Sequence, residues 1–219
     1  MTETVNSPRR YSSPLRAGQA AATRLQVLDA AWQLFTTQGY VATTVTQVAV
    51  AAGVSVDTLY ATVGRKPVIL REVVESAISG TGNAIPAEER DYVIMVRQAS
   101  DAATKIRIYA DAVAAVSPRT APVFLALRDA AHTDAECASL ETEISSRRAS
   151  NMLLFAADLR VTGELRTDVS DQFIADVVWA TAGAEHYAQL VMARDWTSQQ
   201  YGDYLAEVWT RMFTAPGVS

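Results

Sequence analysis

Four side chains between residues 55 and 62 carry hydroxyl groups that could contact nucleic acid. They are Ser55, Thr58, Tyr60 and Thr62. Ser55 and Thr58 can bond phosphate or base edges, and Tyr60 can donate its hydroxyl to a phosphate while its ring packs. The chemistry available to this segment is therefore noncovalent recognition rather than bond making.

Two further residues in the same segment could read bases directly. Val56 can touch a thymine methyl group, and Asp57 can accept a hydrogen bond from the N4 amino group of cytosine. Asp57 can equally stabilise the start of a helix through the helix dipole, so both interpretations stay open.

Three residues outside this segment are candidates for phosphate contacts. Thr44 and Lys66 each lie at a predicted helix start, where backbone N–H groups and positive charge hold phosphates. Thr44 can also be a simple N-cap. Arg24 is the third candidate.

The elements that would position these residues form a helix-turn-helix pattern. Thr44 can cap a short helix that buries Val48, and Gly53 supplies a break that tolerates positive φ. Ser55 then caps a second short helix through Tyr60, and two short helices joined by a turn with glycine are typical of helix-turn-helix proteins. A helix over residues 23–38 should precede this pair.

The remaining segments are also predicted to be helical, so the fold class is all-α. A helix over 66–79 has Pro67 in its first turn, where the missing N–H costs nothing. Later helices are predicted over 87–98, 102–116, 119–132, 135–160, 170–194 and 198–213. Turn residues over 81–86 mark the best boundary.

This pattern predicts three regions. Residues 1–22 form a flexible basic arm, residues 23–80 the DNA-binding domain with a connecting helix, and residues 85–215 a helical body. The arm contains Arg9, Arg10 and Arg16, which could follow the minor groove or simply keep a disordered tail soluble.

The distribution of charge agrees with this division. The net charge is −5, yet residues 1–80 carry seven Lys and Arg against five Asp and Glu. A basic head on an acidic body suits a head that meets phosphate, although an ordinary solvated surface would explain the same numbers.

Composition argues against several other classes of protein. One cysteine, Cys137, excludes an internal disulfide and a multi-cysteine zinc site, and the two histidines are isolated. No nucleophile, phosphate-binding or metal motif occurs, so we expect no enzyme activity, no cofactor and no metal. No apolar run spans a membrane and no secretory signal is visible, so we expect a cytoplasmic protein.

Residues 23–75 resemble the DNA-binding domain of the TetR (tetracycline-repressor-like) family. The resemblance rests on Val27, Ala30-Ala31, Leu34-Phe35, Gly39-Tyr40, Thr43-Thr44-Val45, Val48-Ala49, Ala52-Gly53-Val54-Ser55, Thr58-Leu59-Tyr60 and Lys66. It covers the first third of the chain. It implies that the body binds a small effector and forms a homodimer.

Candidate effector and dimer residues follow from that implication. The candidate effector contacts are apolar or polar residues of the middle helices, namely Arg97, Tyr109, Phe124, Arg128, His132, Met152 and Phe155. Residues 170–213 carry small residues among bulky ones, and with a symmetry mate they would make a four-helix bundle.

We therefore expect a sequence-specific DNA-binding regulator. In this hypothesis a repressor binds a near-palindromic double-stranded operator and an unknown small molecule releases it. The alternatives are an activator or effector-independent regulator, and a helical enzyme or carrier with a vestigial head.

Overall fold

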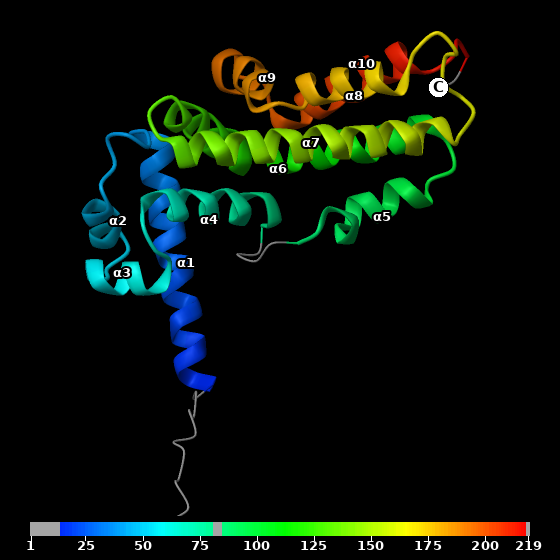
Figure 1. Ribbon diagram of the computed structural model, residues 1–219. Helices are drawn as coiled ribbons and strands as arrows, with labels where there is room; N and C mark the ends of the chain where they lie inside the picture. Colours follow the sequence, from blue (N-terminus) through cyan, green and yellow to red (C-terminus); the bar gives the residue numbers. More distant parts are fainter. Residues whose placement is uncertain (1–13, 81–84, 218–219) are drawn as a thin grey trace, which may run out of the picture.

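The computed structural model describes residues 14–80 and 85–217, and helices account for its regular structure (Figure 1). In chain order they are α1 (Pro14–Thr37), α2 (Val45–Ala51), α3 (Val56–Thr62), α4 (Lys66–Ser79), a 3-10 turn η1 (Ala87–Glu89), α5 (Asp91–Gln98), α6 (Ala102–Ala131), α7 (Ala135–Arg160), α8 (Asp171–Thr181), α9 (Ala184–Tyr187), a π-helical turn η2 (Ala188–Met192) and α10 (Ser198–Phe213). The predicted all-α class is confirmed. The only extended pairing in these ranges is the isolated bridge between Leu165 and Thr214.

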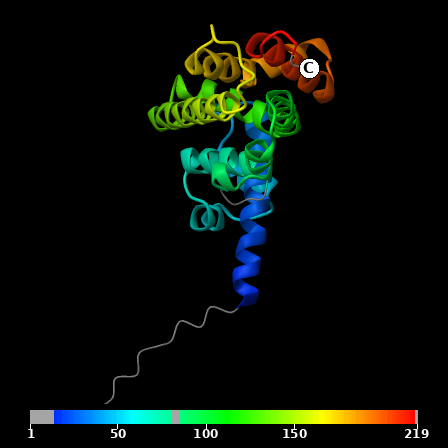
Figure 2. The same ribbon diagram turned by 90° about the vertical axis from the view of Figure 1, so that its right-hand side faces the viewer.

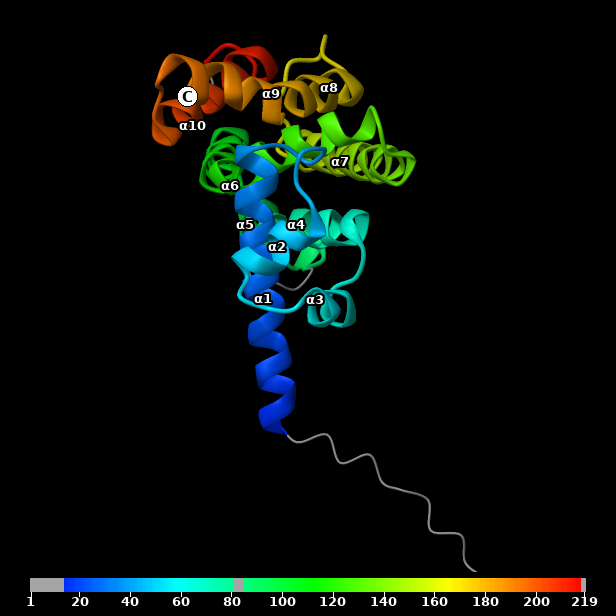
Figure 3. The same cartoon turned by 90° about the vertical axis from the view of Figure 1, so that its left-hand side faces the viewer.

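The helices lie in layers around the long α6–α7 pair. The helices α8, α9 and α10 cover one side of this pair, and α4 and α5 lie on the other side (Figures 1 and 2). The first helix, α1, runs across α4 and reaches α6, while α3 lies at the end of the molecule far from α8 and α10 (Figures 1 and 3).

The first helix is longer than predicted. It begins at Pro14 instead of residue 23, so residues 14–22 are helical and not a flexible arm. The run of alanines over 20–22 has the highest intrinsic helix propensity, and proline is tolerated in a first turn. The remainder of the predicted arm, residues 1–13 with Arg9 and Arg10, lies outside the described residues.

Proline did not end a helix where we expected it to. The predicted break at Ser117-Pro118 is wrong, because α6 runs through Pro118 and Pro122 for 30 residues. Trp32 Nε1 donates to the Arg119 carbonyl at 3.0 Å, and Arg119 Nε donates to the Ala77 carbonyl at 2.7 Å. These contacts and the burial of α6 on several sides offset the local cost of the prolines.

The predicted helix over 170–194 is instead broken into pieces. The first piece, α8, ends at Thr181, and Gly183 precedes α9. A Cβ at Gly183 would lie 3.1 Å from the Ala180 carbonyl oxygen, so the turn favours glycine. Side chains from other helices satisfy the free carbonyls at the end of α8, including Tyr201 Oη, which donates to Thr181 O at 2.6 Å.

Two cores hold the structure together. The first joins Phe35, Leu59 and Ile69 of the N-terminal helices to Leu127 of α6 and Leu140 of α7. It therefore crosses the boundary predicted at 81–86, of which residues 81–84 lie outside the description. The second core lies wholly within the body and includes Trp209, Tyr201 and Ile106. None of the helices in residues 14–80 and 85–217 combines the length and apolarity needed to cross a membrane.

Candidate DNA interface and ligand cavity

The turn between α2 and α3 is shaped by its caps and by one glycine. Thr44 caps α2 in a full capping box with Gln47, and the Ser55 hydroxyl accepts from the backbone N–H of Thr58 at 3.1 Å. Gly53 takes φ of 69°, a left-handed conformation that costs glycine little. Leu59 is fully buried against the first core and fixes which face of α3 points outward.

The outward face of α3 presents four of the six DNA-contacting residues predicted within residues 55–62. Ser55, Asp57, Thr58 and Tyr60 are exposed, Tyr60 to 50%. The Ser55 and Thr58 hydroxyls lie 2.8 Å apart and bond each other. A polar, exposed short helix of this size fits a major groove.

The other two predicted residues of this segment are half-buried. Val56 packs partly against the first core, and the Thr62 hydroxyl donates to the Thr58 carbonyl at 2.6 Å. Both side chains are therefore partly exposed and also make contacts inside the protein.

The three predicted phosphate-contacting residues have intramolecular partners. Thr44 is exposed, but its hydroxyl is used in the capping box. Arg24 pairs with Glu72 of α4. Lys66 Nζ lies 4.1 Å from the centre of the Tyr40 ring, and burial lowers the pKa of its ammonium group while nearby acidic groups raise it.

A set of contacts that the sequence did not suggest ties the head to α7. Arg65 pairs with Glu136 at 2.6 Å and Arg71 with Glu143 at 2.9 Å. The Tyr40 hydroxyl donates to Asp134 Oδ2 at 3.1 Å, and Asp134 is the N-cap of α7. Some of the basic residues of the head therefore pair with acidic residues of the body, so part of the charge difference between the two regions serves contacts within the protein.

A cavity of about 610 Å³ lies between α4, α5, α6 and α7. This volume suits a small organic ligand. Five predicted effector residues line it, namely Arg97, Tyr109, Phe124, Met152 and Phe155. Arg128 and His132 lie outside its wall: Arg128 pairs with Glu185, and His132 Nδ1 lies 2.8 Å from the Arg128 carbonyl.

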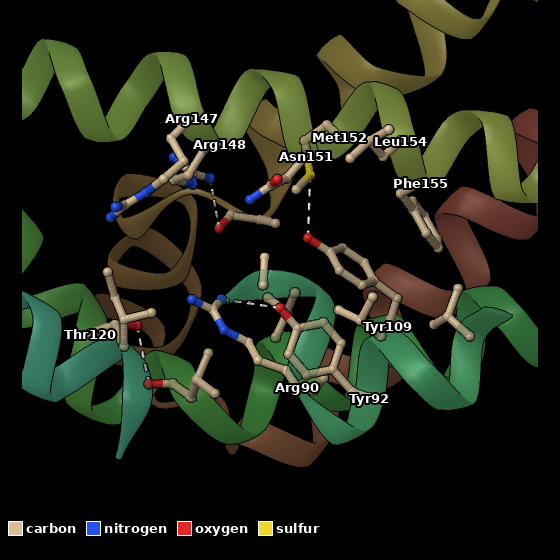
Figure 4. A pocket seen from close by; sticks show the side chains of 18 of the residues that line it. Arg90, Tyr92, Tyr109, Thr120, Arg147, Arg148, Asn151, Met152, Leu154 and Phe155 are labelled. Atoms are coloured by element: carbon tan, nitrogen blue, oxygen red, sulfur yellow. Dashed lines mark hydrogen bonds between the residues drawn. The ribbon is translucent and has the colours of Figure 1, made fainter. Parts of the chain in front are cut away.

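The apolar part of the cavity is built from aromatic and aliphatic side chains (Figure 4). Tyr109 stacks on Phe155 with ring centres 4.3 Å apart, and its hydroxyl donates to Met152 Sδ at 3.3 Å. Sulfur is a weak acceptor. Burial raises the pKa of the Tyr109 phenol above its ordinary value, so this group stays protonated and can donate at neutral pH.

The polar part of the cavity contains residues that sequence reasoning missed. Arg90, Arg147, Arg148 and Asn151 all line the cavity, and Figure 4 shows their polar ends turned toward the same space. They come from η1–α5 and from α7, segments more than fifty residues apart. No local motif could have joined them; only a charge count on the inner face of α7 would have given a hint.

Sequence and structure comparisons place this architecture among known proteins. Residues 27–73 match the family model described as bacterial regulatory proteins, tetR family. Among curated proteins, no sequence matches the chain.

Solved structures resemble the chain over nearly its whole length. A transcriptional regulator from Saccharomonospora viridis in complex with choline aligns with a TM-score of 0.66 at 16% identity, over 89% of this chain and 99% of the other. FadR from Bacillus subtilis in complex with stearoyl-CoA aligns with a TM-score of 0.68 at 18% identity, over 84% of this chain and 96% of FadR. NalD, the secondary repressor of an efflux pump in Pseudomonas aeruginosa, aligns with a TM-score of 0.67 at 16% identity, over 91% of this chain and 99% of NalD.

The family match over residues 27–73 covers the capped α2–α3 pair and most of the N-terminal residues of the first core. These likenesses show the fold of the body, and the match over 27–73 shows the kind of DNA-binding domain that it carries. Residues 27–73 thus form a DNA-binding domain of the tetR family of bacterial regulatory proteins, on a chain whose whole fold is similar to that of solved transcriptional regulators.

Proposed function

We propose that this regulator is a homodimeric repressor that a small molecule releases from a near-palindromic operator. In the complex, α3 enters the major groove, with Ser55, Asp57, Thr58 and Tyr60 facing bases and phosphates. Val56 and Thr62 border that face, and Arg24, Thr44 and Lys66 position the backbone. The two α3 helices of a dimer would meet half-sites about 34–36 Å apart.

The proposed dimer forms through residues 170–213. On α8, Phe173, Val177 and Ala180 follow a helical repeat and are exposed or half-buried. On α10, Tyr204 and Val208 do the same. Two helices with such stripes, paired with their symmetry copies, bury these stripes in a four-helix bundle.

The observation that carries the effector proposal is the position of the cavity. Glu75 and Ile78 of α4 form part of its wall, together with residues of α5, α6 and α7. Glu75 also pairs with Arg147 at 2.9 Å. Because α4 packs on α1 in the core that holds α3, a ligand that moves α4 would change the placement of α3.

Related structures support a ligand in this body without identifying it. One is in complex with choline, a cation, and another with stearoyl-CoA, a large anion. NalD is a repressor of an efflux pump. We infer regulation rather than catalysis for this chain, in the bacterial cytoplasm, where the chromosome lies. An activator or an effector-independent regulator would use the same DNA-binding surface.

The proposal is tested by isolating operator DNA and measuring its affinity. Genomic fragments that the full-length protein retains would be sequenced, and binding to one of them measured by fluorescence anisotropy at two salt concentrations. The double variant Thr58→Ala with Tyr60→Ala should lose at least about tenfold in affinity. Val161→Ala, an 86% exposed residue at the far end of α7, is the matched control.

Two results would contradict this function. One is failure of the wild-type protein to enrich any sequence at low salt. The other is equal affinity of the double variant and the control for the enriched sequence. A reporter gene under the same DNA in a deletion strain separates repression from activation.

A further inference from the structure

We propose that the cavity binds an amphiphile with one acidic group, a carboxylate or sulfonate, on an apolar body. Arg148, Arg90 and Arg147 receive the acidic group, and the aromatic residues around Tyr109 enclose the apolar part. This inference rests on the proposed function, since it assigns a ligand class to the same cavity.

Arg148 is a half-buried cation whose guanidinium lies 5.5 Å from the centre of the Trp179 ring, and the nearby Glu185 carboxylate is not in ion-pair contact with it. Its Nη2 donates to the carbonyls of Trp179 and Ala182, at 3.1 and 3.3 Å, and caps the end of α8. Its guanidinium forms no ion pair within residues 14–80 and 85–217, and its other nitrogens find no acceptor there. Burial lowers the pKa of Arg148, yet an arginine stays charged at neutral pH. A half-buried charge of this kind favours an anion beside it.

Arg90 approaches the same space from the opposite wall. Its guanidinium donates to the Tyr92 hydroxyl at 3.4 Å and to the Ile85 carbonyl at 3.3 Å. Its Nε is buried and has no hydrogen-bond partner among the described residues. A donor left in this state has an energetic cost that a ligand oxygen would remove.

Both arginines line the same cavity as the Tyr109 hydroxyl. The charges of Arg148 and Arg90 each oppose the rise in the pKa of Tyr109 that burial causes. Figure 4 shows the ends of Arg90, Arg148 and Asn151 on the same side of the Tyr109 hydroxyl, while that hydroxyl itself points to Met152. Two cations, a phenol donor and an amide donor thus line the same part of the cavity, and such a set of donors complements the oxygen atoms of an acid.

The cavity wall also contains the acidic residues Asp158 and Glu88, but neither forms an ion pair with Arg90 or Arg148 among the described residues. Asp158 lies ten residues beyond Arg148 on α7, about 15 Å further along the helix. Glu88 lies on η1 and is exposed to solvent. Between Arg148 and Asp158 the wall is formed by Met152 and Phe155, which are buried and apolar. The cavity therefore has a cationic end and an apolar middle.

Glu75 is the one wall carboxylate that already contacts an arginine of the site. It pairs with Arg147 at 2.9 Å and comes from α4. An acidic ligand beside Arg147 and Arg148 competes with Glu75 for Arg147, which links occupancy of the cavity to α4. The same anion that satisfies Arg148 would thus loosen one of the contacts that hold the head.

The experiment compares two dyes of nearly the same shape that differ in charge. The probes are 1-anilinonaphthalene-8-sulfonate, an anion, and N-phenyl-1-naphthylamine, its neutral counterpart. Each is titrated into the full-length protein, and binding is followed by dye fluorescence and by calorimetry for stoichiometry. Variants are Arg148→Gln and Arg90→Gln, and the control is Arg128→Gln, which removes an arginine of the same body outside the cavity wall.

We expect the anionic dye to bind once per protomer, about tenfold or more tightly than the neutral dye. The preference should fall to about twofold or less in Arg90→Gln and Arg148→Gln and persist in Arg128→Gln. Arg90→Gln keeps the test valid if loss of the α8 cap unfolds Arg148→Gln. Equal affinity for the two dyes in wild type, or an unchanged preference in Arg90→Gln, would overturn the proposal. Displacement of the anionic dye by decyltrimethylammonium at lower concentration than by decanoate would also overturn it.

This result is separable from the proposed function because no DNA is present. Loss of the dye preference with normal operator binding would refute the ligand class alone. A clear dye preference in a protein that enriches no DNA would refute the proposed function and leave the ligand class standing.

Discussion

The outward face of α3 and the ligand cavity are both candidate binding surfaces, but they relate to the hydrophobic core in different ways. On α3, the candidate DNA contacts Thr58 and Tyr60 are exposed, and the buried Leu59 lies between them in the chain. In the cavity, Met152 and Phe155 are at once wall residues and members of the second core. Stability and binding can therefore be separated on α3 but are shared by the same side chains in the cavity.

The difference follows from the kind of ligand each surface would take. Duplex DNA meets the outside of a helix, so its contacts need no buried residues. A small amphiphile must be surrounded, so its contacts are drawn from the core itself. Evolution of a new DNA sequence preference would then cost this fold less than evolution of a new ligand preference.

The largest expected effect is in the cavity wall. Phe155→Ala removes a ring that is 5% exposed and stacks on Tyr109. We expect a loss of about 3–5 kcal/mol in the free energy of unfolding, together with altered dye binding. Urea denaturation with calorimetric binding measures both. If Phe155→Ala altered dye binding and left stability unchanged, binding and stability would be separable in the cavity as well as on α3.

The neighbouring pair Leu59 and Tyr60 tests the other surface. Leu59→Ala should cost about 2–5 kcal/mol of stability, because its side chain is fully buried. Tyr60→Ala should change stability by less than about 0.5 kcal/mol and still weaken operator binding severalfold. The measurement is denaturation beside anisotropy on the same preparations. Equal stability losses for both variants would show that this face is not separable from the core.

A smaller effect is expected at the start of α2. Thr44→Ala removes the side-chain half of the capping box with Gln47. The expected loss is about 1 kcal/mol in unfolding free energy. Thr44→Ser keeps the hydroxyl and should retain most of that stability. An alanine variant as stable as wild type would mean that packing alone holds α2.

The smallest effect concerns pH and the contact between α4 and α7. The hydrogen bond from Arg71 holds the pKa of Glu143 below its ordinary value, against a smaller opposing effect of burial. The unfolded chain therefore binds this proton more readily, so the stabilisation is complete above the unfolded pKa of about 4.3 and is lost as pH falls through the lower folded value. Because both side chains are exposed, we expect less than about 1 kcal/mol.

Glu143→Gln supplies the reference for this titration. Unfolding curves of wild type and variant should differ at pH 6 and converge as the solution is acidified below about pH 4. A difference that grows toward acid pH would contradict the assigned direction of the pKa shift.

Local signals predicted the head well. The caps at Thr44 and Ser55, the break at Gly53 and the first turn of α4 at Pro67 act within a few residues, so their types and spacing define the structure. The body was predicted less well where tertiary packing overrides local preference. Pro118 lies inside a helix because that helix is held by Trp32 and Ala77, which are distant in sequence.

The binding residues of the cavity could likewise be predicted only in part from the sequence. Aromatic residues such as Tyr109 and Phe155 could be chosen as candidates because they are apolar and lie on middle helices. Arg90 and Arg148 could not, because an arginine looks the same in sequence whether it faces solvent or a cavity. Only the packing of α5 and α7 on α6 brings these two arginines to one cavity.

The most direct test of the proposed DNA-binding surface is a footprint of the full-length protein on a DNA fragment that it enriches. We expect protection of two half-sites on one face of the duplex, about 10 base pairs apart or a small multiple of that spacing, and loss of both when Thr58 and Tyr60 are replaced by alanine. Absence of protection at low salt and micromolar protein, or protection that survives the double replacement, would contradict it.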